Sequence, residues 1–417
     1  MTFKPQIGAF GKVLIKFTGS QVLYNGLRMV AGFLVVRMIA PEIYGAFSGV
    51  GVFLGYVLLG HFGIINGLGR DIPFELGKNN QLLVKRLASL GLWVSYLVGA
   101  IASFIFLLAL LYQVLYGTQS DVIVYASYTI ISFFYLLNKQ FLPVLFRTNN
   151  EFDTLSKINI GMAFVNIASV SLVWGYGFYG LCLRAVLLIC IEFILLYYYR
   201  PINVSPHWDT KLAISQIKTG LPIYAVGQVR PLWATVQNNL IFSMGGPLQF
   251  GYFALANIIN GALGVIPNAI SQVVYPKMSI QLGEGKSVAE ILKKIIKPTI
   301  FLFLIIFSIG GVTYWLLPLI VPLLLPKYVG GVEVAQWSVF IPVVASLGLV
   351  NNIYNVVKKQ KWYFISLLTG ALSGLGYTII MVLTEGFNLV YFPQGMLIGF
   401  FIQVVLSFAF LSKLKES

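Results

Sequence analysis

Residues 87–114 read LASLGLWVSYLVGAIASFIFLLALLYQV, an apolar stretch without a charged side chain. About 20 consecutive apolar residues in a helix are enough to cross the hydrocarbon core of a bilayer, which is roughly 30 Å thick. Comparable stretches recur along the whole 417-residue chain. The sequence therefore predicts an all-α protein that crosses a membrane many times.

The overall composition agrees with this interpretation. Hydrophobic residues make up 58% of the chain and charged residues 10%, whereas soluble domains carry about 25% charged residues. We predict twelve transmembrane helices, at residues 13–39, 43–66, 85–115, 121–145, 156–176, 178–199, 219–243, 249–274, 292–320, 334–357, 362–384 and 390–411.

The positive charges predict how the chain is oriented. Of the 28 lysines and arginines, 23 lie near the two ends of the chain or in the loops that follow even-numbered spans, whereas the opposite loops hold only Lys327. Loops rich in Lys and Arg stay on the cytoplasmic side. We therefore expect both termini on the cytoplasmic side of the membrane. Because topology accounts for the net charge of +15, we do not expect nucleic acid as a partner.

Two short matches indicate an internal repeat. Residues 41–47, PEIYGAF, resemble residues 247–253, PLQFGYF, and at the same offset residues 75–80, ELGKNN, resemble residues 281–286, QLGEGK. The offset contains an even number of spans, so both halves would insert in the same orientation, as parallel transporter repeats do.

The repeat predicts two six-helix bundles with a substrate cavity between them. We place the first bundle at residues 1–200, a cytoplasmic linker at 201–218 and the second bundle at 219–417. Such bundles in the parallel arrangement are typical of transporters.

Polar side chains interrupt several spans, although charged ones cost at least a few kcal/mol in a membrane. Helices 1, 7 and 8 each carry polar residues at helical spacing, which predicts polar faces turned away from lipid. The candidate substrate-binding residues are Gln21, Asn25, Arg28, Arg37, Arg184, Gln228, Arg230, Asn257, Asn260, Asn268 and Gln272. Two structural alternatives stay open. Amides can simply join helices, at about 0.6 kcal/mol each, and Arg37 and Arg184 can reach the membrane interface with their long side chains.

Excess positive charge in a cavity favours an anionic substrate. Arginine binds phosphate oxygens in a bidentate geometry, and amides suit sugar hydroxyls. The residues therefore predict a saccharide that carries phosphate or pyrophosphate. Glu192 is the only carboxylate deep within a span. It either neutralises an arginine or carries a proton, so coupling to H⁺ or Na⁺ stays open.

Several enzyme signatures are missing from the sequence. It contains no phosphate loop of the G-x-x-x-x-G-K-[ST] type, no H-E-x-x-H motif and no Cys/His cluster. We therefore expect a protein that is not an enzyme and holds no cofactor or metal.

Three segments carry a family resemblance: PEIYGAFSGVGVF (41–53), GIINGLGRDIPFELGKN (63–79) and KTGLPIYAVGQV (218–229). They resemble the Wzx-type O-antigen flippases, which are polysaccharide exporters of the multidrug/oligosaccharidyl-lipid/polysaccharide (MOP) superfamily. The resemblance implies that the chain moves undecaprenyl-pyrophosphate-linked oligosaccharide, a repeat unit of O-antigen or a related surface glycan, from the cytoplasmic to the periplasmic leaflet by alternating access.

The resemblance also implies a cationic central cavity, a role in lipopolysaccharide biosynthesis, and a glycan polymerase and chain-length regulator as partners beside the membrane lipids. One position departs from the family pattern. Many relatives have an acidic residue in the seventh helix, where this chain has Asn238 and Asn239. Glu192 is therefore the remaining candidate for ion coupling.

Related functions are less compatible with the sequence. A multidrug and toxin extrusion (MATE) antiporter would favour cavity carboxylates that hold cationic drugs, and a lipid II flippase would usually carry two more helices at its C-terminus. A membrane-embedded glycan polymerase would need an acidic catalytic residue near a long outward loop, but the longest candidate, 318–333, is short and apolar.

Overall fold

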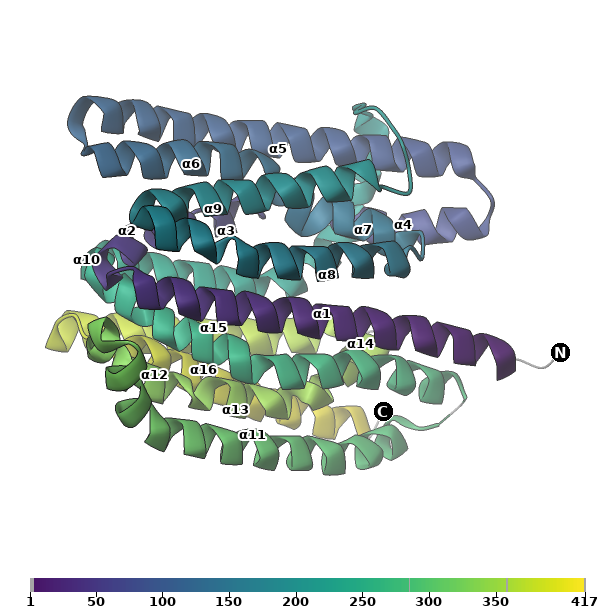
Figure 1. Ribbon diagram of the computed structural model, residues 1–417. Coiled ribbons are helices and arrows are strands. Elements are labelled where there is room, and N and C mark those ends of the chain that lie inside the picture. The colour runs from purple at the N-terminus through teal and green to yellow at the C-terminus, as the bar shows by residue number, and fades with distance from the viewer. Residues whose placement is uncertain (1–3, 285, 358, 416–417) are drawn as a thin grey trace. The chain divides into compact units, whose positions relative to one another are not determined.

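The computed structural model describes residues 4–284, 286–357 and 359–415, and no strand occurs among them. The chain forms two compact units, whose helices are shown in Figure 1. Unit 1 comprises Met1–Met38 and Val50–Gly227, and unit 2 comprises Ile39–Gly49 and Gln228–Ser417. The short segment Ile39–Gly49 thus leaves unit 1 to pack with unit 2. The predicted bundle boundaries at residues 200 and 219 stay a prediction about domains.

Long apolar helices form unit 1. They are α1 (Lys4–Met38), α3 (Leu54–Val57), α4 (Ile64–Gly77), α5 (Gln81–Tyr116), α6 (Gln119–Leu136), the π-helical turn η1 (Leu137–Phe141), α7 (Leu142–Thr148), α8 (Phe152–Ala168), α9 (Val170–Tyr198) and the start of α10 (Thr210–Gly283).

Unit 2 contains the remaining elements. They are α2 (Pro41–Gly51) up to Gly49, α10 from Gln228 onward, α11 (Val288–Leu324), η2 (Pro326–Gly331), α12 (Val332–Ser338), α13 (Phe340–Ser346), the 3₁₀ segment η3 (Leu347–Asn351), α14 (Asn352–Val356), α15 (Gln360–Glu385) and α16 (Tyr391–Lys415).

The predicted membrane-spanning character is confirmed. Eight helices of the described residues are long and apolar enough to cross a membrane. One of them, Thr210–Pro267, covers the predicted span 219–243 and most of the predicted span 249–274, and the chain turns between them at Gly246, whose φ is 72°. A second turn lies at Gly177, with φ 54°, between the predicted spans 156–176 and 178–199. Glycine adopts positive φ without the steric cost that a Cβ brings.

Two spans that we predicted as continuous helices are broken, and the prediction is wrong there. The predicted span 43–66 consists of α2, α3 and the start of α4. Just before α4, Phe62 and Gly63 have positive φ angles of 45° and 82°. The predicted span 334–357 consists of α12, α13, η3 and α14. Apolar composition predicts that a segment crosses the membrane, but irregular backbone within it is tolerated where protein buries it.

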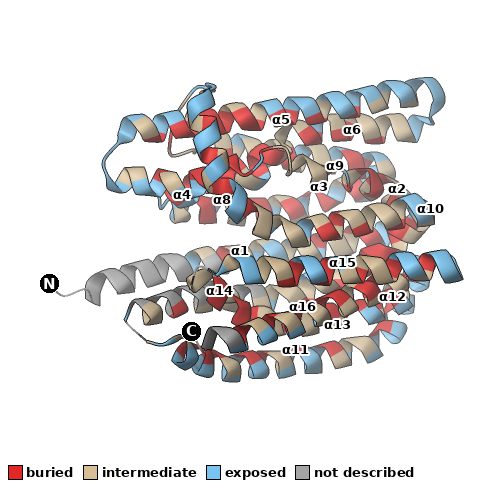
Figure 2. Cartoon of the chain, turned by 180° about the vertical axis from the view of Figure 1, so that it is seen from behind, coloured by how far each residue is buried: buried red, intermediate tan, exposed pale blue. Residues whose placement is uncertain are grey.

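The surface of α5 shows why the protein needs a lipid environment. Only 33% of the residues in its most apolar window are buried, and Ile101, Phe104 and Leu108 are each more than half exposed. Figure 2 shows exposed residues along α5 beside the buried ones. Such a continuous apolar surface would favour aggregation in water, whereas hydrocarbon chains solvate it.

The repeated motifs meet within unit 2. Gly45 and Gly251 are equivalent positions of the two motifs, and each lies against the backbone of the other motif. A Cβ on Gly45 would overlap the carbonyl oxygen of Pro247, and a Cβ on Gly251 would overlap that of Pro41. Small residues allow helices in membranes to approach this closely. The shared glycine therefore has a packing role.

Candidate substrate-binding site

Arg230 lies inside unit 2, on α10. Its Nη2 donates a hydrogen bond of 3.1 Å to Oε1 of Gln403 on α16, and its guanidinium lies 5.1 Å from the ring centre of Phe400 on the same helix. Its Nε is buried without a hydrogen-bond partner among the described residues. The guanidinium is thus oriented by α16 but keeps unused hydrogen-bonding capacity.

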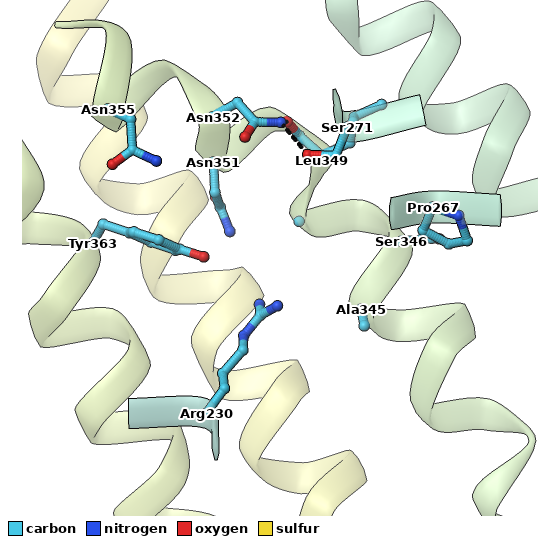
Figure 3. Close-up of a pocket in the computed structure, with 11 residues that line it drawn as sticks. Arg230, Pro267, Ser271, Ala345, Ser346, Leu349, Asn351, Asn352, Asn355 and Tyr363 are labelled. Atoms are coloured by element: carbon cyan, nitrogen blue, oxygen red, sulfur yellow. Dashed lines mark hydrogen bonds between the residues drawn. The ribbon is translucent and has the colours of Figure 1, made fainter. Parts of the chain in front are cut away.

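A cavity of about 110 Å³ adjoins Arg230. Its lining residues come from α10 and from the region between α13 and α15, and they are Arg230, Pro267, Ser271, Ala345, Ser346, Gly348, Leu349, Asn351, Asn352, Asn355 and Tyr363. Figure 3 shows the guanidinium of Arg230, the side chain of Asn351 and the hydroxyl of Tyr363 turned toward a common space. The lining residues that the structure describes include one cation and no carboxylate.

The break in the predicted span 334–357 supplies the amides of this cavity. Asn351 ends the 3₁₀ segment η3, and Asn352 begins α14. The side-chain nitrogen of Asn352 donates to Oγ of Ser271 at 2.9 Å and to the carbonyl oxygen of Leu349 at 3.0 Å. A 3₁₀ segment inside a longer helix often marks a functional hinge or a strained sequence. Here it brings amides toward Arg230.

The sequence prediction missed this cluster. Asn351, Asn352 and Asn355 lie in a segment that we interpreted as an ordinary span, SLGLVNNIYNVV at residues 346–357. The same reasoning that singled out the amides of helices 1, 7 and 8 applies to these three asparagines. The three closely spaced asparagines within an apolar span were therefore a sequence signal for this cluster.

The other predicted residues of unit 2 lie in different surroundings. Gln228 is partly buried, Asn257 is exposed, and Asn260 is partly buried with an unpaired Oδ1. Asn268 and Gln272 lie outside the residues whose side chains the structure describes. Of the predicted residues whose side chains the structure describes, Arg230 is the one in the lining of this cavity.

The predicted residues of α1 belong to unit 1. Asn25, Arg28 and Arg37 are exposed, and Gln21 is partly exposed. The helix packs against α8 and α9. The prediction that Arg28 and Arg230 face one common cavity stays a prediction.

Glu192 on α9 forms an ion pair in unit 1. Its Oε2 accepts a hydrogen bond from Nζ of Lys139 at 2.7 Å, and the two side chains are 16% and 34% exposed. Lys139 lies in the π-helical turn η1, within the predicted span 121–145. The neighbouring Asn138 donates to the carbonyl oxygen of Ile189 at 2.7 Å. Two contacts therefore join this turn to α9.

Arg184, the remaining predicted arginine, is partly buried on α9. Its Nη2 donates to the backbone oxygen of Asn166 at 3.4 Å and to the side-chain oxygen of the same residue at 3.3 Å. Asn166 is 4% exposed near the end of α8. These contacts tie α9 to α8, so the arginine has a structural partner inside unit 1.

Solved structures define the class of fold. The chain is similar to an inward-facing multidrug resistance MATE family transporter of the MOP superfamily, with a TM-score of 0.72, 16% identity and coverage of 95% of this chain and 96% of that one. It is similar to an outward-facing transporter of the same description, with a TM-score of 0.63, 15% identity and 97% coverage of both chains. The protein therefore has the fold of the MOP-superfamily transporters.

A third solved structure is a MOP superfamily transporter from Pyrococcus furiosus, described as having a binding pocket of reverse polarity that suggests a different function. Its TM-score is 0.62, with 16% identity and 97% coverage of both chains. No curated protein matches this sequence.

The family is defined by the sequence itself. Residues 11–281, more than half of the chain, match the family described as polysaccharide biosynthesis protein. The chain belongs to this family. The resemblance to the polysaccharide exporters of the MOP superfamily is thereby confirmed at the level of family and fold.

Proposed function

We propose that the chain is a flippase that moves undecaprenyl-pyrophosphate-linked oligosaccharide from the cytoplasmic to the periplasmic leaflet of a bacterial inner membrane. The substrate would be a repeat unit of O-antigen or a related surface glycan. A glycan polymerase and a chain-length regulator would act on the product. The observation that carries the proposal is Arg230, a cation within an apolar helical bundle beside a cavity lined by amides.

The physical argument concerns charge. An arginine within a span costs at least a few kcal/mol unless it has a partner or a function. A guanidinium with unused donors is suited to phosphate or carboxylate oxygens. Membership of a polysaccharide biosynthesis family supports a glycan as the remainder of the substrate. Arg28, Arg37 and Arg184 would contribute further positive charge along the pathway.

The electrical potential across the membrane would also favour export. A cell interior that is negative by 100 mV contributes about 2.3 kcal/mol for each negative charge moved outward. If an ion gradient contributes as well, Glu192 is the carboxylate that we propose for the coupling. Its ion pair with Lys139 would have to open before it could take up a proton.

An antiporter of the multidrug class is the second candidate, because solved structures of this fold are described as multidrug transporters. Binding of cationic drugs would require carboxylates in the site. Among the residues that the structure describes around this cavity, none is a carboxylate. The polarity of this cavity therefore favours the flippase.

Complementation tests the proposal. In a strain without its own flippase, surface glycan would be measured for the wild type, Arg28→Ala, Arg230→Ala and the corresponding Lys variants, with Arg70→Ala as a control for loss of an exposed arginine. At normal protein level, Ala should abolish export and Lys should retain part of it. Normal export by all four variants would contradict the cationic pathway, and acquired resistance to cationic drugs would favour the antiporter.

A further inference from the structure

Buried hydrogen-bond donors without partners belong to the lining of the cavity beside Arg230 and to a residue that contacts Arg230. Asn351 is 4% exposed, and its Nδ2 has no partner among the described residues. Gln403, which is 1% exposed, lies behind Arg230 and is not one of the lining residues; its oxygen accepts from Arg230, and its Nε2 has no partner among the described residues. Nε of Arg230 is unpaired too. A buried donor without an acceptor costs about 1–3 kcal/mol, so these groups indicate a missing acceptor.

The donors converge from different helices. Arg230 approaches from α10, Asn351 from the end of η3 and Tyr363 from α15, and all three point toward the same space in Figure 3. Gly348 keeps that space open between two of them. A Cβ at this position would lie 3.4 Å from Nδ2 of Asn351 and 3.7 Å from Nη2 of Arg230.

The chemistry of the lining defines the ligand class. The described lining residues offer one guanidinium and several neutral donors and no carboxylate, a combination that suits a group with negative charge on oxygen. A cavity of about 110 Å³ has room for a small group such as a carboxylate or a phosphate.

We propose that this cavity of unit 2 is an oxyanion site that binds one carboxylate or phosphate group. The 3₁₀ break at Leu347–Asn351 forms the site by turning Asn351 toward Arg230. The oxyanion would be an acidic substituent of the transported glycan or a free inorganic anion. Because Arg230 also belongs to the proposed transport pathway, the glycan source rests on the proposed function, whereas anion binding itself does not.

Binding of inorganic phosphate to the purified full-length protein tests the site. Equilibrium dialysis with radiolabelled phosphate should show saturable binding of about one phosphate per chain. Arg230→Gln should weaken binding at least 10-fold because it removes the charge, and Asn351→Leu should weaken it several-fold. Gly348→Val should also weaken it at least 10-fold by filling the cavity while the charge stays. Arg70→Gln, which removes an exposed arginine of unit 1, should bind like the wild type.

Folding is checked separately for each variant by its elution volume and its thermal unfolding midpoint. No saturable binding to the wild type would overturn the proposal, as would unchanged binding in both folded Arg230→Gln and folded Gly348→Val. If one of these two variants fails to fold, the other decides.

Competitors distinguish the sources of the anion. Glucuronate, sulfate and glucose would be added against labelled phosphate. Displacement by glucuronate supports the site with an acidic sugar as its ligand, and displacement by sulfate alone supports it with a free inorganic anion. Displacement by neutral glucose would overturn the assignment to an oxyanion.

The export assay separates this proposal from the proposed function. Phosphate binding that Gly348→Val abolishes without reducing surface glycan would show an anion site that export does not use. Export that depends on Arg230, combined with no phosphate binding to the wild type, would keep the flippase and refute the oxyanion site.

Discussion

The ion pair of Lys139 with Glu192 shows how single residues make charges acceptable within a span. Nζ of Lys139 lies 2.7 Å from Oε2 of Glu192 in unit 1, so the positive and the negative charge compensate each other. Removing one partner leaves the other charge unpaired in poorly hydrated surroundings, which costs more than removing both. The pair therefore offers a structural account of Glu192 that competes with ion coupling.

A double-mutant cycle distinguishes these two roles. We expect Lys139→Met to destabilise the protein more than Lys139→Met combined with Glu192→Gln, with a coupling energy of about 0.5–3 kcal/mol. Unfolding of the purified variants would give this energy. If the pair is only structural, the double variant should also regain export. Export lost in Glu192→Gln and in the double variant, at normal stability, would instead support ion coupling.

Asp209 provides a residue-scale prediction outside the membrane. It precedes α10, accepts a hydrogen bond from the backbone N–H of Leu212, and pairs with Arg86 at 2.5 Å. The Leu212 N–H, followed by the Arg86 guanidinium, holds the pKa of Asp209 below its usual value of 3.8. A carboxyl whose pKa is lower in the folded protein stabilises the fold at pH values above its pKa in the unfolded chain. This stabilisation is lost as the pH falls through the pKa of the folded protein.

Asp209→Asn should therefore lower the thermal midpoint at pH 7. The difference from the wild type should shrink as the pH falls below about 4, the usual pKa of an aspartate, because the wild-type carboxyl then becomes neutral as well. Thermal unfolding between pH 7 and pH 3 measures this trend. A difference that is constant over the whole range would contradict the charge-based explanation.

At the scale of elements, the repeated motifs explain how α2 and α10 pack. Gly45 and Gly251 are placed so that each backbone lies against the other motif, at Pro247 and Pro41. Tyr328, which is fully buried, donates a hydrogen bond of 3.2 Å to the carbonyl oxygen of Ile39 in the same unit. These contacts explain why the segment Ile39–Gly49 groups with unit 2.

Gly45→Ala should consequently destabilise the protein. The new methyl group would overlap the Pro247 carbonyl oxygen, so the helices must separate. Overpacking of this kind typically costs about 1–3 kcal/mol. Gly376→Ala on α15 is the matched control, because a Cβ there meets no atom within 4 Å. Thermal unfolding midpoints of the purified variants decide the matter, and equal midpoints for both would refute a close helix contact at Gly45.

At the scale of the whole molecule, the distribution of charge predicts an orientation. Lys78 and Gln119 are exposed at opposite ends of α5, a helix of 36 residues that is about 54 Å long at 1.5 Å per residue. The positive-inside rule places Lys78 in the cytoplasm. The ends of this one helix therefore report the orientation of unit 1.

Single-cysteine labelling measures that orientation. In a background in which Cys182 and Cys190 are replaced by alanine, a membrane-impermeant maleimide added to intact cells with a permeabilised outer membrane should label Gln119→Cys and spare Lys78→Cys. Labelling of both after disruption of the inner membrane is the control for reactivity. The opposite pattern in intact cells would place the termini outside.

Much of the architecture could be predicted because membrane insertion depends on local composition. The apolar run at residues 87–114 identifies α5 without knowledge of any other part of the chain, and the glycines at 177 and 246 lie at the turns between predicted spans. The breaks at Gly63 and at Leu347–Asn351 could not be predicted in this way. Their backbone groups depend on contacts with other helices for their stability.

The candidate site was predicted only in part for the same reason. Arg230 was identified because an arginine within an apolar span is costly wherever the helix packs. Its partner Gln403 is 173 positions away in the sequence, and Asn351 reaches the cavity only because η3 departs from α-helical geometry. Which distant side chains meet is a property of packing, so no local pattern could indicate it.

The sequence alone determined the membrane-spanning class, the family and the charges that need an explanation, because transfer of each segment from water to lipid depends on that segment alone. Only the tertiary structure decided that the glycines of the two repeats touch, that Glu192 pairs with Lys139 and that Arg230 borders a donor-lined cavity. Each of these contacts joins residues far apart in the chain, and their free energy exists only once the helices have packed.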